Sequence, residues 1–107
     1  METTPRRYEL RYLPLFWEDL SGAAAYIAFD LKNPAAAQRL VDGVEAGILE
    51  HLQNPTMSPT YRTTRDRPLS YHWFPVGNYR VFYVVDGDTV EARRLLHGAR
   101  DIESLIR

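Results

Sequence analysis

The basic residues of this chain are almost all arginines, and several of them gather near its end. Of the thirteen lysines and arginines twelve are arginine, and the stretch RRLLHGARDI, residues 93–102, places three of them and a histidine around one glycine. Guanidinium groups bind phosphates and carboxylates through paired hydrogen bonds, and a histidine can transfer a proton near neutral pH. These residue types predict an anion site with an acid–base group. Its candidate residues are Arg80, Arg93, Arg94, Arg100 and His97.

A plainer interpretation stands beside this one for each candidate. Arg80 can be a strand arginine that pairs with a carboxylate such as Glu91 or Asp101. His72 belongs to a site only if it faces the same concavity as the arginines. Tyr83 is expected to pack in the sheet, although an exposed tyrosine could stack on a base.

The composition limits the class of protein. A chain of 107 residues is long enough for one domain, residues 1–107, and its net charge of −1 argues against nucleic-acid binding through the overall field. It contains no cysteine, and the histidines at 51, 72 and 97 do not form a spaced metal motif, so we expect no metal and no cofactor. With no apolar run of about 20 residues and no signal peptide, a cytoplasmic protein without membrane contact is expected.

Two helices are predicted in the first half. Tyr8, Leu10 and Tyr12 alternate with polar residues as in a strand, which Pro14 is expected to close. The apolar residues of 15–31 then recur every three to four positions, which predicts a helix over 15–30 with Leu31 on its apolar stripe and Trp17 in the core. Asparagine and proline at 33 and 34 begin a second helix that ends before Asn54 and Pro55. So short a link makes the two helices an antiparallel hairpin.

Strands are predicted in the second half, after a loop over 55–68 that has room for a short edge strand. The candidate strands are 69–76, 78–85 and 89–97, and the DGD between the last two indicates a β-hairpin. Strict alternation in the last strand would place Val90, Ala92, Arg94 and Leu96 on one face. Its other face would carry Glu91, Arg93, Leu95 and His97.

The tail, residues 99–107, returns to helical spacing, and His51 is expected to be a solvated cation at the end of the second helix. The predicted fold is therefore α+β: an N-terminal strand and a helical hairpin, packed on a mainly antiparallel sheet with a C-terminal three-strand meander and a short terminal helix.

The same segments resemble the RelE/ParE superfamily of bacterial type II toxins. The helical hairpin WEDLSGAAAYIAFDLKNPAAAQRLVDGVEAGILEHLQNP and the later FPVGNYRVFYVVDGDTVEARRLLHGARDI carry the resemblance, which covers nearly the whole chain. It implies a small toxin that a cognate antitoxin wraps and blocks. Members of the RelE branch are ribosome-dependent endoribonucleases that cleave mRNA, whereas members of the ParE branch poison DNA gyrase.

The resemblance also bears on the choice between the branches. The RelE-like arginines match Arg80 and Arg100, but the lysine positions hold His72 and Phe74, and Ile106 stands near the place of the terminal tyrosine. The ending LLHGARDI is most similar to the ParE branch, in which Arg100 and Asp101 would serve the fold.

Three hypotheses follow, with different partners. The favoured one is a non-enzymatic toxin, of the kind known from plasmid stabilization systems, that binds DNA gyrase and inhibits growth. The alternative is a ribosome-dependent endoribonuclease in which Arg80 binds the scissile phosphate, His97 acts as general acid or base, and Arg93 or Arg100 stabilises the developing charge. The third is a degenerate toxin that only binds its antitoxin. A homodimer and a toxin–antitoxin hetero-oligomer both remain open.

Overall fold

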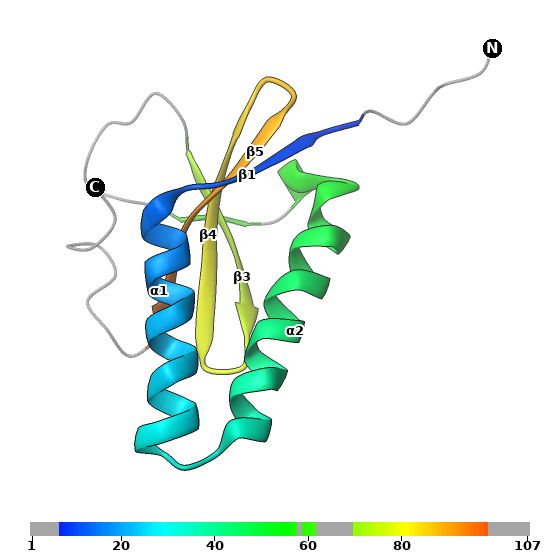
Figure 1. Ribbon diagram of the computed structural model, residues 1–107. Helices are drawn as coiled ribbons and strands as arrows, with labels where there is room; N and C mark the ends of the chain where they lie inside the picture. Colours follow the sequence, from blue (N-terminus) through cyan, green and yellow to red (C-terminus); the bar gives the residue numbers. More distant parts are fainter. Residues whose placement is uncertain (1–6, 58, 62–69, 99–107) are drawn as a thin grey trace.

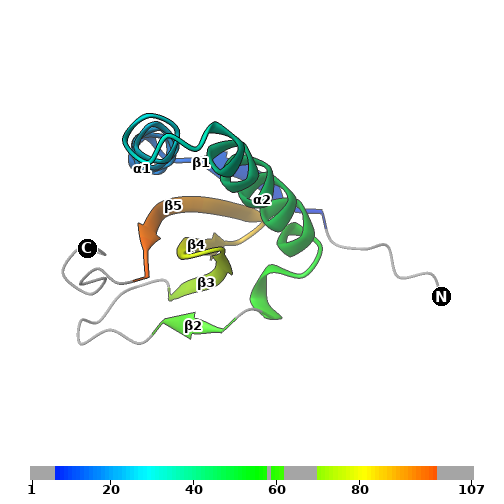
Figure 2. The same ribbon diagram turned by 90° about the horizontal axis from the view of Figure 1, so that it is seen from below.

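The computed structural model describes residues 7–57, 59–61 and 70–98, which form two layers. Two antiparallel helices cover one face of a five-stranded sheet (Figures 1 and 2). The helices are α1 (Pro14–Ala25) and α2 (Pro34–Leu52), with a π-helical turn η1 (Tyr26–Asp30) after α1 and a 3₁₀ turn η2 (Pro55–Met57) after α2. The strands are β1 (Glu9–Tyr12), β2 (Thr60–Tyr61), β3 (Tyr71–Val76), β4 (Tyr79–Asp86) and β5 (Thr89–His97). The predicted α+β fold is confirmed, while the predicted terminal helix over 99–107 lies outside the described residues.

The strand order is β1-β5-β4-β3-β2, and the sheet is mixed. Strands β2 to β5 pair antiparallel, as the meander predicted, and β1 pairs parallel with β5 through the register Leu10↔Val90. Gly77 and Gly87, at φ +57° and +59°, occupy the two hairpin turns, where only a residue without a Cβ adopts this conformation at low cost.

The helical hairpin begins and turns at prolines. Pro14 does not merely close the first strand: it is the first residue of α1, where a missing N–H costs no hydrogen bond. The last turn of the predicted helix widens into η1, in which Leu31 N donates to Tyr26 O at 3.0 Å. The predicted cap of α2 is confirmed, because the Asn33 side chain accepts a hydrogen bond from Ala36 N at 3.1 Å.

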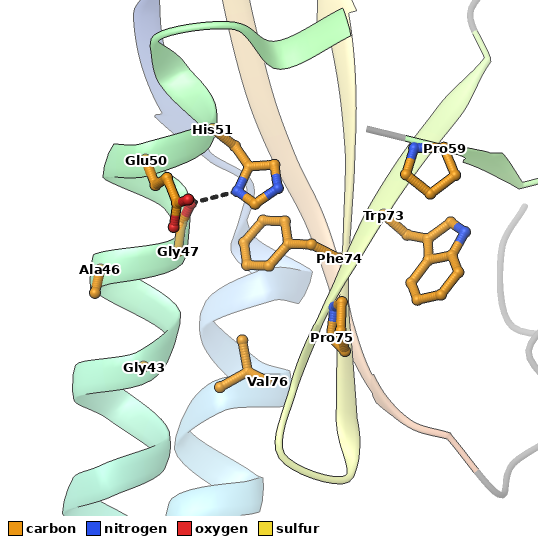
Figure 3. Close-up of a pocket in the computed structure, with 10 residues that line it drawn as sticks. All are labelled: Gly43, Ala46, Gly47, Glu50, His51, Pro59, Trp73, Phe74, Pro75 and Val76. Atoms are coloured by element: carbon orange, nitrogen blue, oxygen red, sulfur yellow. Dashed lines mark hydrogen bonds between the residues drawn. The ribbon is translucent and has the colours of Figure 1, made fainter. Parts of the chain in front are cut away.

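A close approach fixes α2 on β3. A Cβ at Gly47 would lie 2.4 Å from Phe74 Cε2, so this helix face admits only glycine here. The His51 ring stacks on Phe74 at 4.1 Å between centroids, and His51 Nδ1 lies 2.7 Å from Gly47 O (Figure 3). The prediction that His51 is a solvated cation is therefore wrong, because the side chain is half-buried in the helix–sheet contact.

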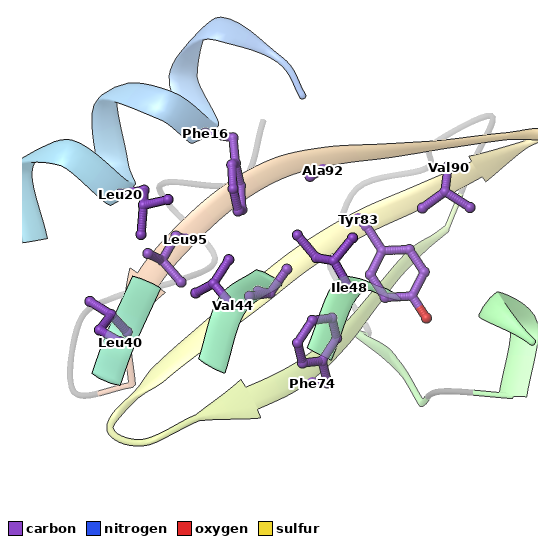
Figure 4. Close-up of a cluster of buried hydrophobic side chains, with 11 residues drawn as sticks. Phe16, Leu20, Leu40, Val44, Ile48, Phe74, Tyr83, Val90, Ala92 and Leu95 are labelled. Atoms are coloured by element: carbon purple, nitrogen blue, oxygen red, sulfur yellow. The ribbon is translucent and has the colours of Figure 1, made fainter. Parts of the chain in front are cut away.

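The main core lies between the helices and the sheet (Figure 4). Its buried side chains are Phe16, Leu20, Leu40, Val44, Ile48, Phe74, Val81, Tyr83, Val90, Ala92 and Leu95. Trp17 was predicted to join it but is 49% exposed and stacks on Tyr12, and Leu31 is also exposed. Trp17 directly follows the fully buried Phe16, and successive helical positions face different directions. Leu31 follows η1, whose wider turn breaks the helical period that would place Leu31 on the apolar stripe.

A smaller apolar cluster lies on the other face of the sheet. It comprises Tyr71, Phe82, Val84 and Leu96, with Trp73 packed against it. Since the main core lies on the helix side, both faces of the sheet are partly apolar, and polar side chains surround the smaller cluster.

No helix in the described part of the chain is both long and apolar enough to span a membrane.

Candidate functional site

An arginine–aromatic face lies on the side of the sheet that α1 and α2 leave uncovered. We define it by Trp73 and Tyr71 of β3, Arg80 of β4 and Arg93 of β5. The Arg80 guanidinium lies 4.8 Å from the centre of the Trp73 ring, and that of Arg93 lies 5.9 Å from the centre of Tyr71. Both distances fit cation–π contacts. Figure 3 shows Trp73 and Phe74 on opposite sides of β3, so Trp73 projects away from the helices.

The two arginines of this face differ in their charge partners. Arg93 pairs with Glu91 at 2.9 Å. Burial lowers the pKa of Arg93, but hydrogen bonds with Glu91 and Tyr71 outweigh it and raise the pKa above the usual value. Within the described residues no carboxylate pairs with Arg80, so the expected Arg80–Glu91 pair is not formed. Of the two arginines on this face, Arg80 is thus the one without a carboxylate partner in the described part of the chain.

A β-bulge in β5 changes which side chains share a face. Tyr83 pairs with Ala92 while Phe82 pairs with Arg94, so Arg93 is an extra residue in β5. Strict alternation fails at this point: Val90, Ala92 and Leu95 all enter the main core, and Leu96 enters the smaller cluster. The predicted faces were correct up to Ala92 and wrong for Leu95 and Leu96.

Arg94 is held by α1 and does not belong to the arginine–aromatic face. Its Nε and Nη2 donate to Asp19 at 2.7 and 3.0 Å, and Leu95 N donates to the same carboxylate at 2.9 Å. Hydrogen bonding to Asp19 raises the pKa of Arg94. Asp19 is a residue that the sequence reasoning missed. No local pattern signals a contact across 75 positions.

His97 lies at the end of β5, where it lines one cleft together with Arg80 and Trp73. It is the register partner of Tyr79, and the two rings meet edge to face at 5.2 Å. Directly opposed residues share a face and neighbours along a strand do not, and Tyr79 packs against the main core. Arg80 and His97 thus leave the sheet from opposite faces, but at the strand ends they line the same cleft of about 670 Å³. The structure therefore brings these two predicted site residues to one cleft.

His72 and Tyr83 are on the helix side of the sheet. Their rings stack at 5.4 Å, and Tyr83 is only 2% exposed. The Tyr83 hydroxyl donates to Pro55 O at 2.5 Å, which ties η2 to the sheet. Tyr83 is thus a core residue and offers no surface to a partner, contrary to its place among the target-binding candidates.

The remaining candidates lie outside the described residues. These are Arg100 with Asp101, and the loop arginines Arg62, Arg65 and Arg67. In the described residues no group of three histidine, aspartate or glutamate side chains could hold a metal ion. The described geometry thus offers a basic aromatic surface on which Arg80 has no carboxylate partner among these residues.

The comparisons with known proteins bear on the whole domain. The family model of the ParE toxin of the parDE type II toxin–antitoxin system matches residues 10–102. The chain belongs to this ParE toxin family. The matched range runs from β1 past the end of β5, so it contains both helices, the arginine–aromatic face and the β-bulge.

Two solved structures are similar to this ParE-family chain. One is the chromosomal ParDE toxin–antitoxin system from P. aeruginosa, with a TM-score of 0.67 and 13% identity over 86% of this chain and 97% of that one. The other is the archaeal RelE–RelB complex from Pyrococcus horikoshii OT3, with a TM-score of 0.52 and 19% identity over 87% and 97%. At these identities the similarity shows the fold alone. No curated protein sequence matches significantly.

In this ParE-family fold the two positions that the resemblance assigned to RelE-like lysines are structural. His72 stacks on Tyr83, and Phe74 is buried against His51 and Gly47. Neither side chain lies on the arginine–aromatic face. The Arg80 guanidinium lies over the Trp73 ring, and His97 lines the same cleft.

Proposed function

We propose that this chain is the growth-inhibiting toxin of a type II toxin–antitoxin pair and that it acts on DNA gyrase without cleaving nucleic acid. Membership of the ParE family supports the toxin role. The two similar structures are a ParDE system and a RelE–RelB complex, which supports a cognate antitoxin as the partner of this chain.

One observation carries the choice of a non-enzymatic mechanism. The positions matched to the RelE-like lysines hold His72, whose ring stacks on Tyr83, and the buried Phe74, so neither position supplies a second cation for a phosphate bound at Arg80. The arginine–aromatic face instead combines arginine, tryptophan and tyrosine, the residue types enriched at energetically important positions of protein interfaces.

The test uses the purified toxin with gyrase and relaxed plasmid. We expect loss of supercoiling and accumulation of linear plasmid, both reversed when the antitoxin is added first. The same preparation is added to translating ribosomes, and the mRNA ends are mapped by primer extension. Growth inhibition with cleaved mRNA and unimpaired gyrase would overturn the proposal in favour of the endoribonuclease.

The endoribonuclease remains the second candidate because Arg80 and His97 line one cleft, which supports a histidine near a phosphate bound at Arg80. Arg80→Ala would abolish mRNA cleavage if Arg80 binds the scissile phosphate. A chain that neither inhibits growth nor affects either target, but still binds its antitoxin, would be the degenerate form.

A further inference from the structure

A cleft lies on the helix side of the sheet, between α1 with its π-helical turn and the ends of β4 and β5. Its volume is about 530 Å³. The lining residues used below are Glu18, Asp19, Gly22, Tyr26, Tyr79 and His97. None of them is one of the four residues that define the arginine–aromatic face, but Tyr79 and His97 also line the cleft of Arg80 and Trp73, so the two clefts adjoin.

Two tyrosines form the aromatic part of this cleft. Tyr26 is 52% exposed and comes from the first position of η1, whereas Tyr79 is half-buried at the start of β4. Burial, and next the proximity of Tyr26, raise the pKa of Tyr79. Both phenols line this one cleft, although they come from different layers of the fold.

The carboxylates of the cleft are unequal. Asp19 is satisfied by Arg94 and by Leu95 N. Glu18 is exposed, lines the same cleft and makes no ion pair with another described residue. With Asp19 engaged by Arg94, Glu18 is the cleft carboxylate that can accept hydrogen bonds from a further cation.

The wall of α1 leaves room for an occupant. A Cβ added at Gly22 would meet no atom within 4 Å, in contrast to Gly47, whose missing Cβ is required by Phe74. Gly22 is thus not needed for packing within the chain. The open space beside Gly22 lies between Glu18, about one helical turn before it, and Tyr26, about one turn after it.

From these features we infer that the cleft receives the guanidinium of an arginine side chain from a protein partner. Tyr26 and Tyr79 offer ring surfaces on which a guanidinium can lie, and Glu18 accepts its hydrogen bonds. Arginine suits this combination better than lysine, because a planar guanidinium stacks on an aromatic ring and donates to a carboxylate at the same time. The inference does not depend on whether the toxin acts on gyrase or on mRNA.

The experiment is an NMR titration of the isotope-labelled toxin with the capped tripeptide acetyl-Gly-Arg-Gly-amide. Matched peptides carry citrulline, which keeps the shape and loses the charge, or lysine. We expect arginine-dependent shifts at the amides of Gly22, Tyr26 and Tyr79, and binding at least roughly tenfold weaker for citrulline, since a charge-assisted hydrogen bond is lost. Equal binding of citrulline, or shifts confined to other residues, would overturn the inference.

Variants test the assignment of each group. Glu18→Gln and Tyr26→Ala should each weaken the arginine peptide by roughly threefold to tenfold. Glu45→Gln, an equally exposed acid on α2, serves as the matched control and should change the affinity less than about twofold. Both cleft residues are exposed, so their variants should keep the parent spectrum elsewhere. Unchanged affinity in both folded variants would contradict the site.

Discussion

The carboxylate of Asp19 in α1 joins Arg94 in β5, with the Arg94 Nε 2.7 Å from Asp19 Oδ2. The contact is mostly shielded from water, because the side chains of Arg94 and Asp19 are 18% and 14% exposed. β1 pairs with β5 only as far as Ala92, and Asp19 accepts a hydrogen bond from the N–H of Leu95, three residues further along β5. A helix side chain therefore takes over where the edge strand ends.

Replacing Asp19 with alanine should destabilise the fold by about 2–3 kcal/mol, because the Arg94 guanidinium and the Leu95 N–H lose their partner in a shielded site. Urea unfolding followed by circular dichroism measures this change. Glu18→Ala, at the adjacent exposed position, should change the free energy of unfolding by less than about 0.5 kcal/mol. A double-mutant cycle with Arg94→Ala should give a coupling free energy clearly above zero, and additive losses would contradict the pair.

Two glycines of the helices should respond to alanine in opposite directions. Gly47→Ala places a Cβ 2.4 Å from Phe74 Cε2, and the resulting displacement should cost about 1–3 kcal/mol, more than the gain in helix propensity. Gly22→Ala meets no atom within 4 Å and should stabilise the protein by about 0.5–1 kcal/mol. Thermal unfolding of both variants measures the difference. Stabilisation by both would show that α2 does not need to lie close to β3.

Removing the Tyr83 hydroxyl should affect stability and not target binding. In Tyr83→Phe the buried carbonyl of Pro55 loses its donor, which should cost about 1–2 kcal/mol. Growth inhibition per folded molecule should equal that of the parent, because Tyr83 is buried. A folded variant that no longer inhibits growth would mean that Tyr83 becomes accessible on binding.

Alkaline pH should weaken the fold through Tyr12 and Tyr79. Burial raises the pKa of both side chains, with smaller contributions from Glu45 for Tyr12 and from Tyr26 for Tyr79. The folded state thus prefers the neutral phenols. Their contribution to the free energy of unfolding is fully present below the unfolded-state pKa of 10.0 and is lost as the pH rises through the higher pKa values of the folded state. The free energy of unfolding should fall above about pH 10.

Tyr12→Phe and Tyr79→Phe separate the two contributions to this pH dependence. Each should reduce the loss of stability between about pH 9 and 11, measured by urea unfolding, because one phenol no longer ionises. Tyr8→Phe provides the control, since the pKa values of Tyr12 and Tyr79 do not depend on it. If neither variant changed how steeply the free energy of unfolding falls with pH, other groups would be responsible for the alkaline loss of stability.

Much of the fold follows from local patterns in the sequence. The spacing of apolar residues predicted both helices and the three strands of the meander, because each amphipathic element must turn its apolar side to the core. The cap at Asn33 and the glycine turn at 87 were likewise legible, since each depends on neighbours a few residues away. The order of these elements also carried the resemblance that the family match confirmed.

The tertiary structure decided which side chains share a face of the sheet. Strict alternation misplaced Leu95 and Leu96, because the bulge at Arg93 follows from how β5 pairs with β4 and not from its own sequence. The arginines illustrate the same limit. Residue types alone made Arg80, Arg94 and His97 look like one site, whereas in the structure Arg80 and His97 line one cleft and Arg94 pairs with a helix carboxylate.

The sequence by itself therefore determined the elements, their order and the family, since these depend on short-range periodicity and on the chemistry of turns. Only the tertiary structure decided which charges meet. Contacts such as Asp19 with Arg94 join residues 75 positions apart, and the energy of such a contact depends on the geometry that the rest of the chain imposes.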